Sequence, residues 1–169
     1  MVVQIKFKIP LILSEHMAKT GNKAHHTGTI KKTVKINAAK DKVWRKISNI
    51  SGLPAWVVDV KKTVYLSKKK SGVGAVRLIT FEDGNKIEEH VVSWVKGEHF
   101  TYVATEGLPL RAYVATISIK SKARNQTEIT WQSYLNSEAM SEKQFIEFIA
   151  FLGSFYEASL ENLKMLLEK

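Results

Sequence analysis

The fold is decided near the end of the chain, by residues 141–167, SEKQFIEFIAFLGSFYEASLENLKMLL. Apolar residues recur there every three or four positions, which predicts one long amphipathic helix. Ser141, followed three residues later by Gln144, is typical of a helix start. A helix of about 26 residues is ~39 Å long and needs an apolar partner of similar length. The apolar stripe consists of Phe145, Phe148, Ile149, Leu152, Phe155, Tyr156, Leu160, Leu163 and Leu167.

The preceding part of the chain can supply that partner as a β-sheet. Stretches with strand-like patterns, separated by turns, cover residues 60–67, 75–83, 86–95, 98–107, 110–121 and 127–136. Connections of hairpin length predict that the sheet is antiparallel. One more strand is predicted at residues 27–37, followed by two short helices at 39–48 and 51–59, with Pro54 in the first turn of the second.

A strand, two short helices, six antiparallel strands and one long helix make an α+β layout. A sheet that covers a single long helix must curve around it, and such curvature leaves space between the two. Ligands usually bind in spaces of this kind. We therefore expect a domain over residues 27–169 with an internal cavity.

Composition narrows the class of protein. The chain has 169 residues, 44% of them hydrophobic, which suits one domain with a real core. No apolar run approaches the roughly 20 residues of a membrane span. The sequence has no cysteine, which excludes disulfides, thiolate metal sites and cysteine nucleophiles. This composition also fits a cytoplasmic protein.

The net charge of +10 raises the question of an anionic partner. Two features argue against nucleic acid: lysines are spread over many segments, and only Arg45, Arg77, Arg111 and Arg124 carry a guanidinium. Peripheral contact with a membrane and binding of a protein partner both stay open.

Residues 1–26 form an N-terminal extension whose order the sequence does not reveal, and Met17 is an alternative start. His16, His25 and His26 raise the question of a metal site, but histidines near a terminus are usually just solvated, so we expect none.

The alternation of side chains along the strands indicates which residues face inward. Trp131 lies on the apolar face of one strand and Tyr113 on that of another. In residues 86–95, KIEEHVVSWV, the more apolar face contains Ile87, Glu89, Val91, Ser93 and Val95, which places the Glu89 carboxylate inside. In residues 75–83 the pattern leaves two faces open: Arg77, Ile79 and Phe81, or Val76, Leu78 and Thr80.

Several segments together resemble the START-like (SRPBCC) superfamily, and within it the polyketide cyclase/dehydrase-like family. The similarity covers about residues 28–168 and rests on residues 35–66, KINAAKDKVWRKISNISGLPAWVVDVKKTVYL, on GVGAVR (72–77), on EEHVVSWVKGEHFTYVA (88–104) and on TEITWQSYL (127–135) before the long helix. The resemblance implies a helix-grip fold, in which a seven-stranded antiparallel sheet curves around the C-terminal helix and encloses an elongated apolar cavity. It does not settle the function, because members include carriers, cyclases and regulators.

The resemblance favours the face with Arg77 inward. Counted from the turn at residues 83–85, Arg77 and Glu89 then lie within about one pairing step of each other on adjacent strands. An inward carboxylate is costly unless it is paired, and a guanidinium is a suitable partner. We predict an Arg77–Glu89 ion pair in or at the rim of the cavity. It either orients a polar group of a ligand or only fixes the strand register.

The other candidate ligand-binding residues are mostly large and apolar. They are Trp56, Phe81, Tyr102, Tyr113, Trp131, Phe148, Leu152 and Phe155, together with Arg111 in a loop, residues 107–111, that resembles a cavity mouth. Core packing is the competing interpretation for each aromatic residue, and a solvated turn for Arg111.

These features favour binding or transport of a hydrophobic small molecule, such as a lipid, a quinone or a polyketide-like compound. The alternative is a cyclase- or dehydratase-type enzyme that uses an acid–base pair in the same cavity. No catalytic motif demands the second interpretation, and we expect neither a cofactor nor a metal.

Overall fold

The computed structural model describes residues 25–169 and consists of one antiparallel sheet and one long helix, with two short helical segments between the first two strands. The elements, in chain order, are β1 (His26–Ile36), α1 (Lys40–Ile47), the 3₁₀ turn η1 (Leu53–Ala55), β2 (Val60–Tyr65), β3 (Val76–Phe81), β4 (Lys86–Val95), β5 (His99–Glu106), β6 (Ala112–Ala123), β7 (Gln126–Ser137) and α2 (Glu142–Leu167). The α+β helix-grip prediction is confirmed. Of the predicted N-terminal extension, residues 1–24 lie outside the described residues.

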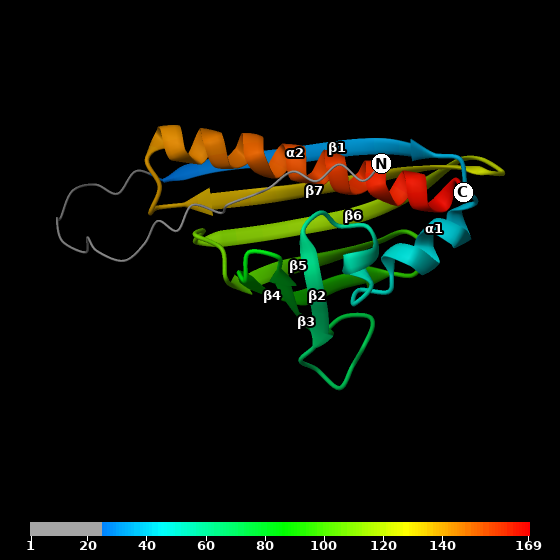
Figure 1. The fold of residues 1–169 in the computed structure, drawn as a ribbon, viewed down its shortest axis with the longest axis horizontal. Helices are drawn as coiled ribbons and strands as arrows, with labels where there is room; N and C mark the ends of the chain where they lie inside the picture. The colour runs from blue at the N-terminus through cyan, green and yellow to red at the C-terminus, as the bar shows by residue number, and fades with distance from the viewer. Residues whose placement is uncertain (1–24) are drawn as a thin grey trace.

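The strand order is β1-β7-β6-β5-β4-β3-β2, and every neighbouring pair is antiparallel. Consecutive strands from β2 to β7 are therefore neighbours, as their short connections require. The first strand instead pairs with the last along its whole length, from His26 opposite Ser137 to Ile36 opposite Thr127. Helix α2 runs along β1 and β7, whereas β2 and β3 form the other edge of the sheet (Figure 1).

Helix α2 begins and packs as its sequence pattern predicts. The Ser141 side chain accepts a hydrogen bond from the Gln144 backbone N–H, and the Gln144 side chain accepts one from the backbone of Ser141. This reciprocal capping satisfies two backbone donors that the first turn leaves open. The buried stripe of the helix faces the sheet, and Gly28 of β1 lets the two approach closely, since a Cβ there would meet Ile149 Cδ1 at 2.3 Å.

The second predicted helix, at residues 51–59, is reduced to the single 3₁₀ turn η1. Pro54 lies in its first turn, as expected, but the chain leaves helical geometry at Trp56. The segment continues with Asp59 at a φ of 55°, a left-handed conformation that directs the chain into β2.

A β-bulge changes the inward face of β4 partway along the strand. Val91 pairs with Tyr102, but the next pairing joins Ser93 to Thr101, so Val92 is the extra residue. Beyond the bulge Trp94 packs against the core and Val95 is exposed. The prediction that Ile87, Glu89 and Val91 share the inner face is correct, whereas its extension to Val95 is wrong.

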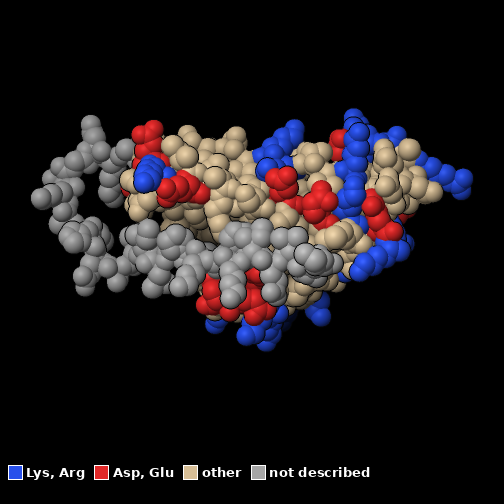
Figure 2. All heavy atoms as spheres, turned by 45° about the horizontal axis from the view of Figure 1, so that its top comes forward, with Lys and Arg blue, Asp and Glu red and all other residues tan. Residues whose placement is uncertain are grey.

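The surface carries both signs of charge. Figure 2 shows Lys and Arg in several separate groups, with Asp and Glu between them on the face drawn. No helix within residues 25–169 is long and apolar enough to cross a membrane.

Candidate functional site

A cavity of about 310 Å³ lies between the inner face of the sheet and α2. Small-molecule sites commonly measure ~300–1,000 Å³, so this volume is at the lower end of that range. Every strand from β2 to β7 contributes to the wall, and η1 and α2 complete it. The candidate residues that line the cavity are Arg77, Phe81, Glu89, Tyr102, Tyr113, Trp131, Phe148, Leu152 and Phe155. Their role in binding a ligand stays a prediction.

The predicted ion pair is present in the cavity wall. Arg77 and Glu89 are direct cross-strand partners on β3 and β4. The Arg77 Nε donates to Glu89 Oε2 at 2.7 Å, and Nη2 lies 2.6 Å from the same oxygen. Only 3% of the Arg77 residue and 6% of Glu89 are exposed. Arg77 also donates from Nη1 to the carbonyl oxygen of Ile50 at 2.9 Å, so all three of its nitrogens have acceptors.

Burial dominates the electrostatics of this pair. It raises the pKa of Glu89 above its ordinary value, because an apolar environment penalises the charged form, and the Arg77 guanidinium offsets only part of that rise. The guanidinium also lies over the ring of Tyr102, 5.0 Å from its centroid, where the face of the aromatic ring attracts the cation.

Three tyrosine hydroxyls lie close to the ion pair. The Tyr102 hydroxyl accepts a hydrogen bond from Trp131 Nε1 at 2.9 Å, and the hydroxyls of Tyr113 and Tyr156 bond to each other. Burial raises the pKa of each of these phenols, since it disfavours the phenolate. They therefore act as neutral hydroxyls at physiological pH and not as bases.

Trp56 does not line the cavity, contrary to the prediction. Its side chain is 2% exposed and packs against Trp131, with ring centroids 5.7 Å apart. Trp131 forms the wall at this point, because its strand faces the cavity directly while Trp56 follows η1 on the core side. The plain packing interpretation is correct for Trp56.

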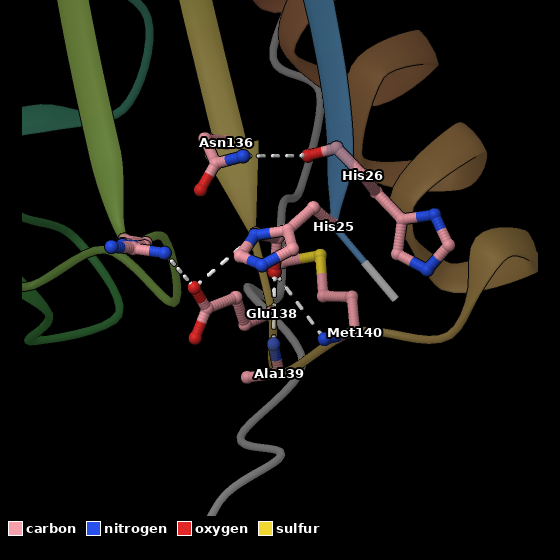
Figure 3. A network of polar contacts seen from close by, with 8 residues as sticks. His25, His26, Asn136, Glu138, Ala139 and Met140 are labelled. Carbon is pink, nitrogen blue, oxygen red and sulfur yellow. Dashed lines mark hydrogen bonds and ion pairs between the residues drawn. The ribbon is translucent and has the colours of Figure 1, made fainter. Parts of the chain in front are cut away.

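Arg111 is also outside the cavity. Its guanidinium is 61% exposed and forms an ion pair with Glu138, just beyond the end of β7. The same carboxylate lies 3.2 Å from His25 Nδ1, and Figure 3 shows Glu138 beside His25, near the start of β1. The network ties the β5–β6 loop to the ends of β1 and β7. Arg111 therefore does not line the cavity, contrary to the expectation from the loop, and a role in binding a ligand stays a prediction.

The mouth of the cavity contains residues that sequence reasoning missed. Exposed Glu82 and Asp83, in the β3–β4 turn, line the cavity, so it reaches the surface there. Asp59 and the half-buried Leu108 and Phe151 line it too. Of the predicted mouth loop 107–111, Leu108 is the residue in the wall. The sequence feature that points to this region is the turn at residues 83–85, which fixes where β3 ends and β4 begins.

Tyr156 is a further residue whose polar contact the sequence pattern did not reveal. It belongs to the apolar stripe of α2, where a tyrosine is most simply a packing residue. Its hydroxyl partner, Tyr113, lies 43 positions earlier in the chain. Within residues 25–169 no three His, Cys, Asp or Glu residues are grouped so that they could hold a metal ion.

Comparison with known proteins agrees with this architecture. A family model described as "Polyketide cyclase / dehydrase and lipid transport" matches residues 27–168. No curated protein matches the sequence.

Solved structures show the same fold at low sequence identity. An uncharacterised protein from Bacillus thuringiensis superposes with a TM-score of 0.70 at 23% identity, over 86% of this chain and 100% of that one. The Zhui aromatase/cyclase from Streptomyces sp. R1128 has a TM-score of 0.70 at 14% identity, over 85% and 94%. Norcoclaurine synthase from Thalictrum flavum, in complex with dopamine and hydroxybenzaldehyde, has a TM-score of 0.65 at 18% identity, over 90% and 96%.

Proposed function

Because the chain belongs to the polyketide cyclase/dehydrase and lipid transport family of the START-like superfamily, we propose that it binds a hydrophobic small molecule between its sheet and α2. The observation that carries the proposal is the wall of the cavity. Aromatic and aliphatic side chains form most of it, and the buried Arg77–Glu89 ion pair is part of the same wall. A space of about 310 Å³ with such walls suits an apolar ligand that has one polar end.

Lipids, quinones and polyketide-like compounds are the ligand classes that fit this description. Removing their apolar surface from water contributes roughly 25 cal/mol per Å², so a snug apolar wall supplies most of the affinity. The ion pair would orient the polar end.

Filling the cavity tests the proposal. The uncharged dye N-phenylnaphthylamine, whose fluorescence rises in apolar surroundings, should bind the wild-type protein. A lipid, quinone or polyketide-like compound that fits the cavity should displace it. Leu152→Trp places a large ring in the cavity wall and should abolish dye binding. Ile146→Trp is the matched control, since Ile146 lies on the same helix but is 61% exposed. Equal dye binding by the two variants, both folded by circular dichroism, would contradict binding in this cavity.

A second candidate, a cyclase- or dehydratase-type enzyme, is favoured by one observation. Glu89 is a buried carboxylate with a raised pKa inside an apolar cavity, next to neutral tyrosine hydroxyls. A group of this kind can accept a proton from carbon next to a carbonyl, while a hydroxyl stabilises the oxygen. Exchange of the acidic hydrogens of β-tetralone in D₂O, followed by NMR, tests this. Exchange that the protein accelerates and Glu89→Gln abolishes would support the enzyme; no acceleration would oppose it.

A further inference from the structure

The two oxygens of the Glu89 carboxylate are in different situations. Both contacts from Arg77 go to Oε2. Oε1 accepts no hydrogen bond from the described residues, although Glu89 lines the cavity and its side chain is only 8% exposed. A buried carboxylate oxygen gains free energy from a donor. Oε1 is thus an acceptor available to a ligand that enters the cavity.

The guanidinium beside it is not available in the same way. Arg77 uses Nε and Nη2 for Glu89 and Nη1 for the Ile50 carbonyl, and its flat face covers the Tyr102 ring. These contacts use three of the five N–H bonds of the guanidinium. A ligand anion at either of the other two would lie close to the Glu89 carboxylate, whose like charge would repel it in an apolar wall.

The remaining charged groups of the cavity wall are acids. In the part of the chain that the structure describes, Asp59, Glu82 and Asp83 line the cavity with Glu89, and Arg77 is the sole base in the wall. This local excess of carboxylates contrasts with the net charge of +10 of the whole chain. The buried Glu89 carboxylate would repel an anionic group through an apolar medium that screens charge poorly, and the exposed Glu82 and Asp83 would add a weaker repulsion at the mouth.

From these three observations, and resting on the proposed function, we propose that the ligand's polar end is a hydrogen-bond donor, a hydroxyl or a protonated amine, bound by Glu89 Oε1. Ligands that end in a carboxylate, such as fatty acids, are excluded. The selectivity comes from the asymmetric use of the Glu89 carboxylate: Arg77 holds one oxygen and leaves the other for the ligand.

A matched series of ten-carbon ligands tests the inference on the wild-type protein. Decanol, decylamine and decanoate share one apolar chain and differ in the polar end. In displacement of N-phenylnaphthylamine at neutral pH, decanol and decylamine should compete at concentrations roughly tenfold or more below decanoate. Equal or stronger competition by decanoate would overturn the inference and leave the proposed function standing. Failure of the dye itself to bind would remove the proposed function, and this inference with it.

Glu89→Gln asks whether Oε1 is the group responsible. The amide oxygen can keep the Arg77 contacts, so the amide NH₂ takes the place of Oε1 and presents a donor to the ligand. The preference for decanol and decylamine over decanoate should then become smaller, or decanoate should become the stronger competitor. Glu88→Gln is the matched control, because it makes the same change one residue earlier, where the carboxylate bonds to His90 and Thr105 outside the cavity wall. An unchanged preference in folded Glu89→Gln would overturn the assignment; the wild-type series decides the matter if that variant does not fold.

Discussion

Arg77 and Glu89 face each other directly across β3 and β4, and the two buried side chains share an ion pair in the wall of the cavity. The two side chains differ in how they can respond to the burial of their charges. Arginine cannot lose its proton in proteins, so its charge stays wherever the fold places it. Glutamate can escape burial of its charge by binding a proton. The two residues are therefore unequal partners, and removing one differs from removing the other.

We expect Glu89→Leu to lower the free energy of unfolding by ~3–5 kcal/mol, because it leaves the Arg77 charge buried without a counter-ion. Glu89→Gln should cost much less, since the amide oxygen still accepts from Arg77. The double variant Arg77→Met, Glu89→Leu should recover most of the loss. Urea unfolding measures all three.

The surface pair formed by Lys122 and Glu128 is the control for these variants. Its Nζ and Oε1 atoms are 3.0 Å apart, but both side chains are partly exposed. Glu128→Leu should therefore change the stability by less than ~1 kcal/mol. Arg77→Met alone completes the cycle. If its loss of stability and that of Glu89→Leu added up to the loss in the double variant, the two residues would not interact energetically.

The pH dependence of stability should reveal the raised pKa of Glu89. Because burial raises this pKa above its ordinary value of 4.5, the folded protein keeps a proton that the unfolded chain has already released. The contribution of Glu89 to stability is then complete below the ordinary pKa and declines as the pH rises through the raised one. The free energy of unfolding of the wild type, minus that of Glu89→Gln, should therefore fall as the pH rises above the ordinary pKa of 4.5. A difference that grows with pH would mean that Arg77 outweighs burial.

The hydrogen bond between the hydroxyls of Tyr113 and Tyr156 should contribute to stability only as a pair. Tyr156→Phe keeps the ring stacked on Trp131, with centroids 4.1 Å apart, but leaves the Tyr113 hydroxyl buried without this partner. We expect a loss of ~1–3 kcal/mol. Replacing both tyrosines with phenylalanine should cost less than the sum of the single changes, as measured by thermal or urea unfolding. Strict additivity would contradict the pairing.

Gly107 should be the glycine that tolerates a side chain least. It has a φ of +90°, and a Cβ there would lie 1.9 Å from the carbonyl oxygen of Lys86. Gly97 has a φ of +79°, but nothing lies within 4 Å of its Cβ position. Gly97→Ala should therefore cost only the ~1–2 kcal/mol of the left-handed backbone.

Gly107→Ala should cost clearly more than Gly97→Ala, because the backbone of β4 must also move away. Since Leu108 follows in the cavity wall, the substitution should in addition weaken binding of N-phenylnaphthylamine. Equal losses of stability in the two variants would show that the loop adjusts without resistance.

The Arg77–Glu89 pairing was within reach of sequence reasoning because it is local. Only twelve positions separate the two residues, and a short turn at residues 83–85 joins their strands. Once the turn is placed, the register follows from counting. The same reasoning failed farther along β4, because a bulge at Val92 inserts one residue and exchanges the two faces. The alternation of apolar and polar side chains at residues 93–95 does not indicate this insertion.

The errors on Trp56 and Arg111 have a different origin. Both residues were assigned to the cavity by their chemical type and by loops that a related fold uses. Trp56 instead packs behind Trp131, and Arg111 meets Glu138, a residue 27 positions away. A side chain on an irregular segment has no periodic pattern to orient it, so its partner depends on how distant elements are arranged.

The sequence by itself determined the order of the elements, the antiparallel pairing of β2 to β7 and the apolar face of α2, because each depends on periodicity and short connections. The tertiary structure alone decided that β1 closes the sheet against β7, that Tyr113 meets Tyr156, and that acids gather at the mouth of the cavity. These contacts join residues far apart in the chain. They depend on how strongly the sheet curves and how closely α2 approaches it, and local patterns of apolar and polar residues do not specify either quantity.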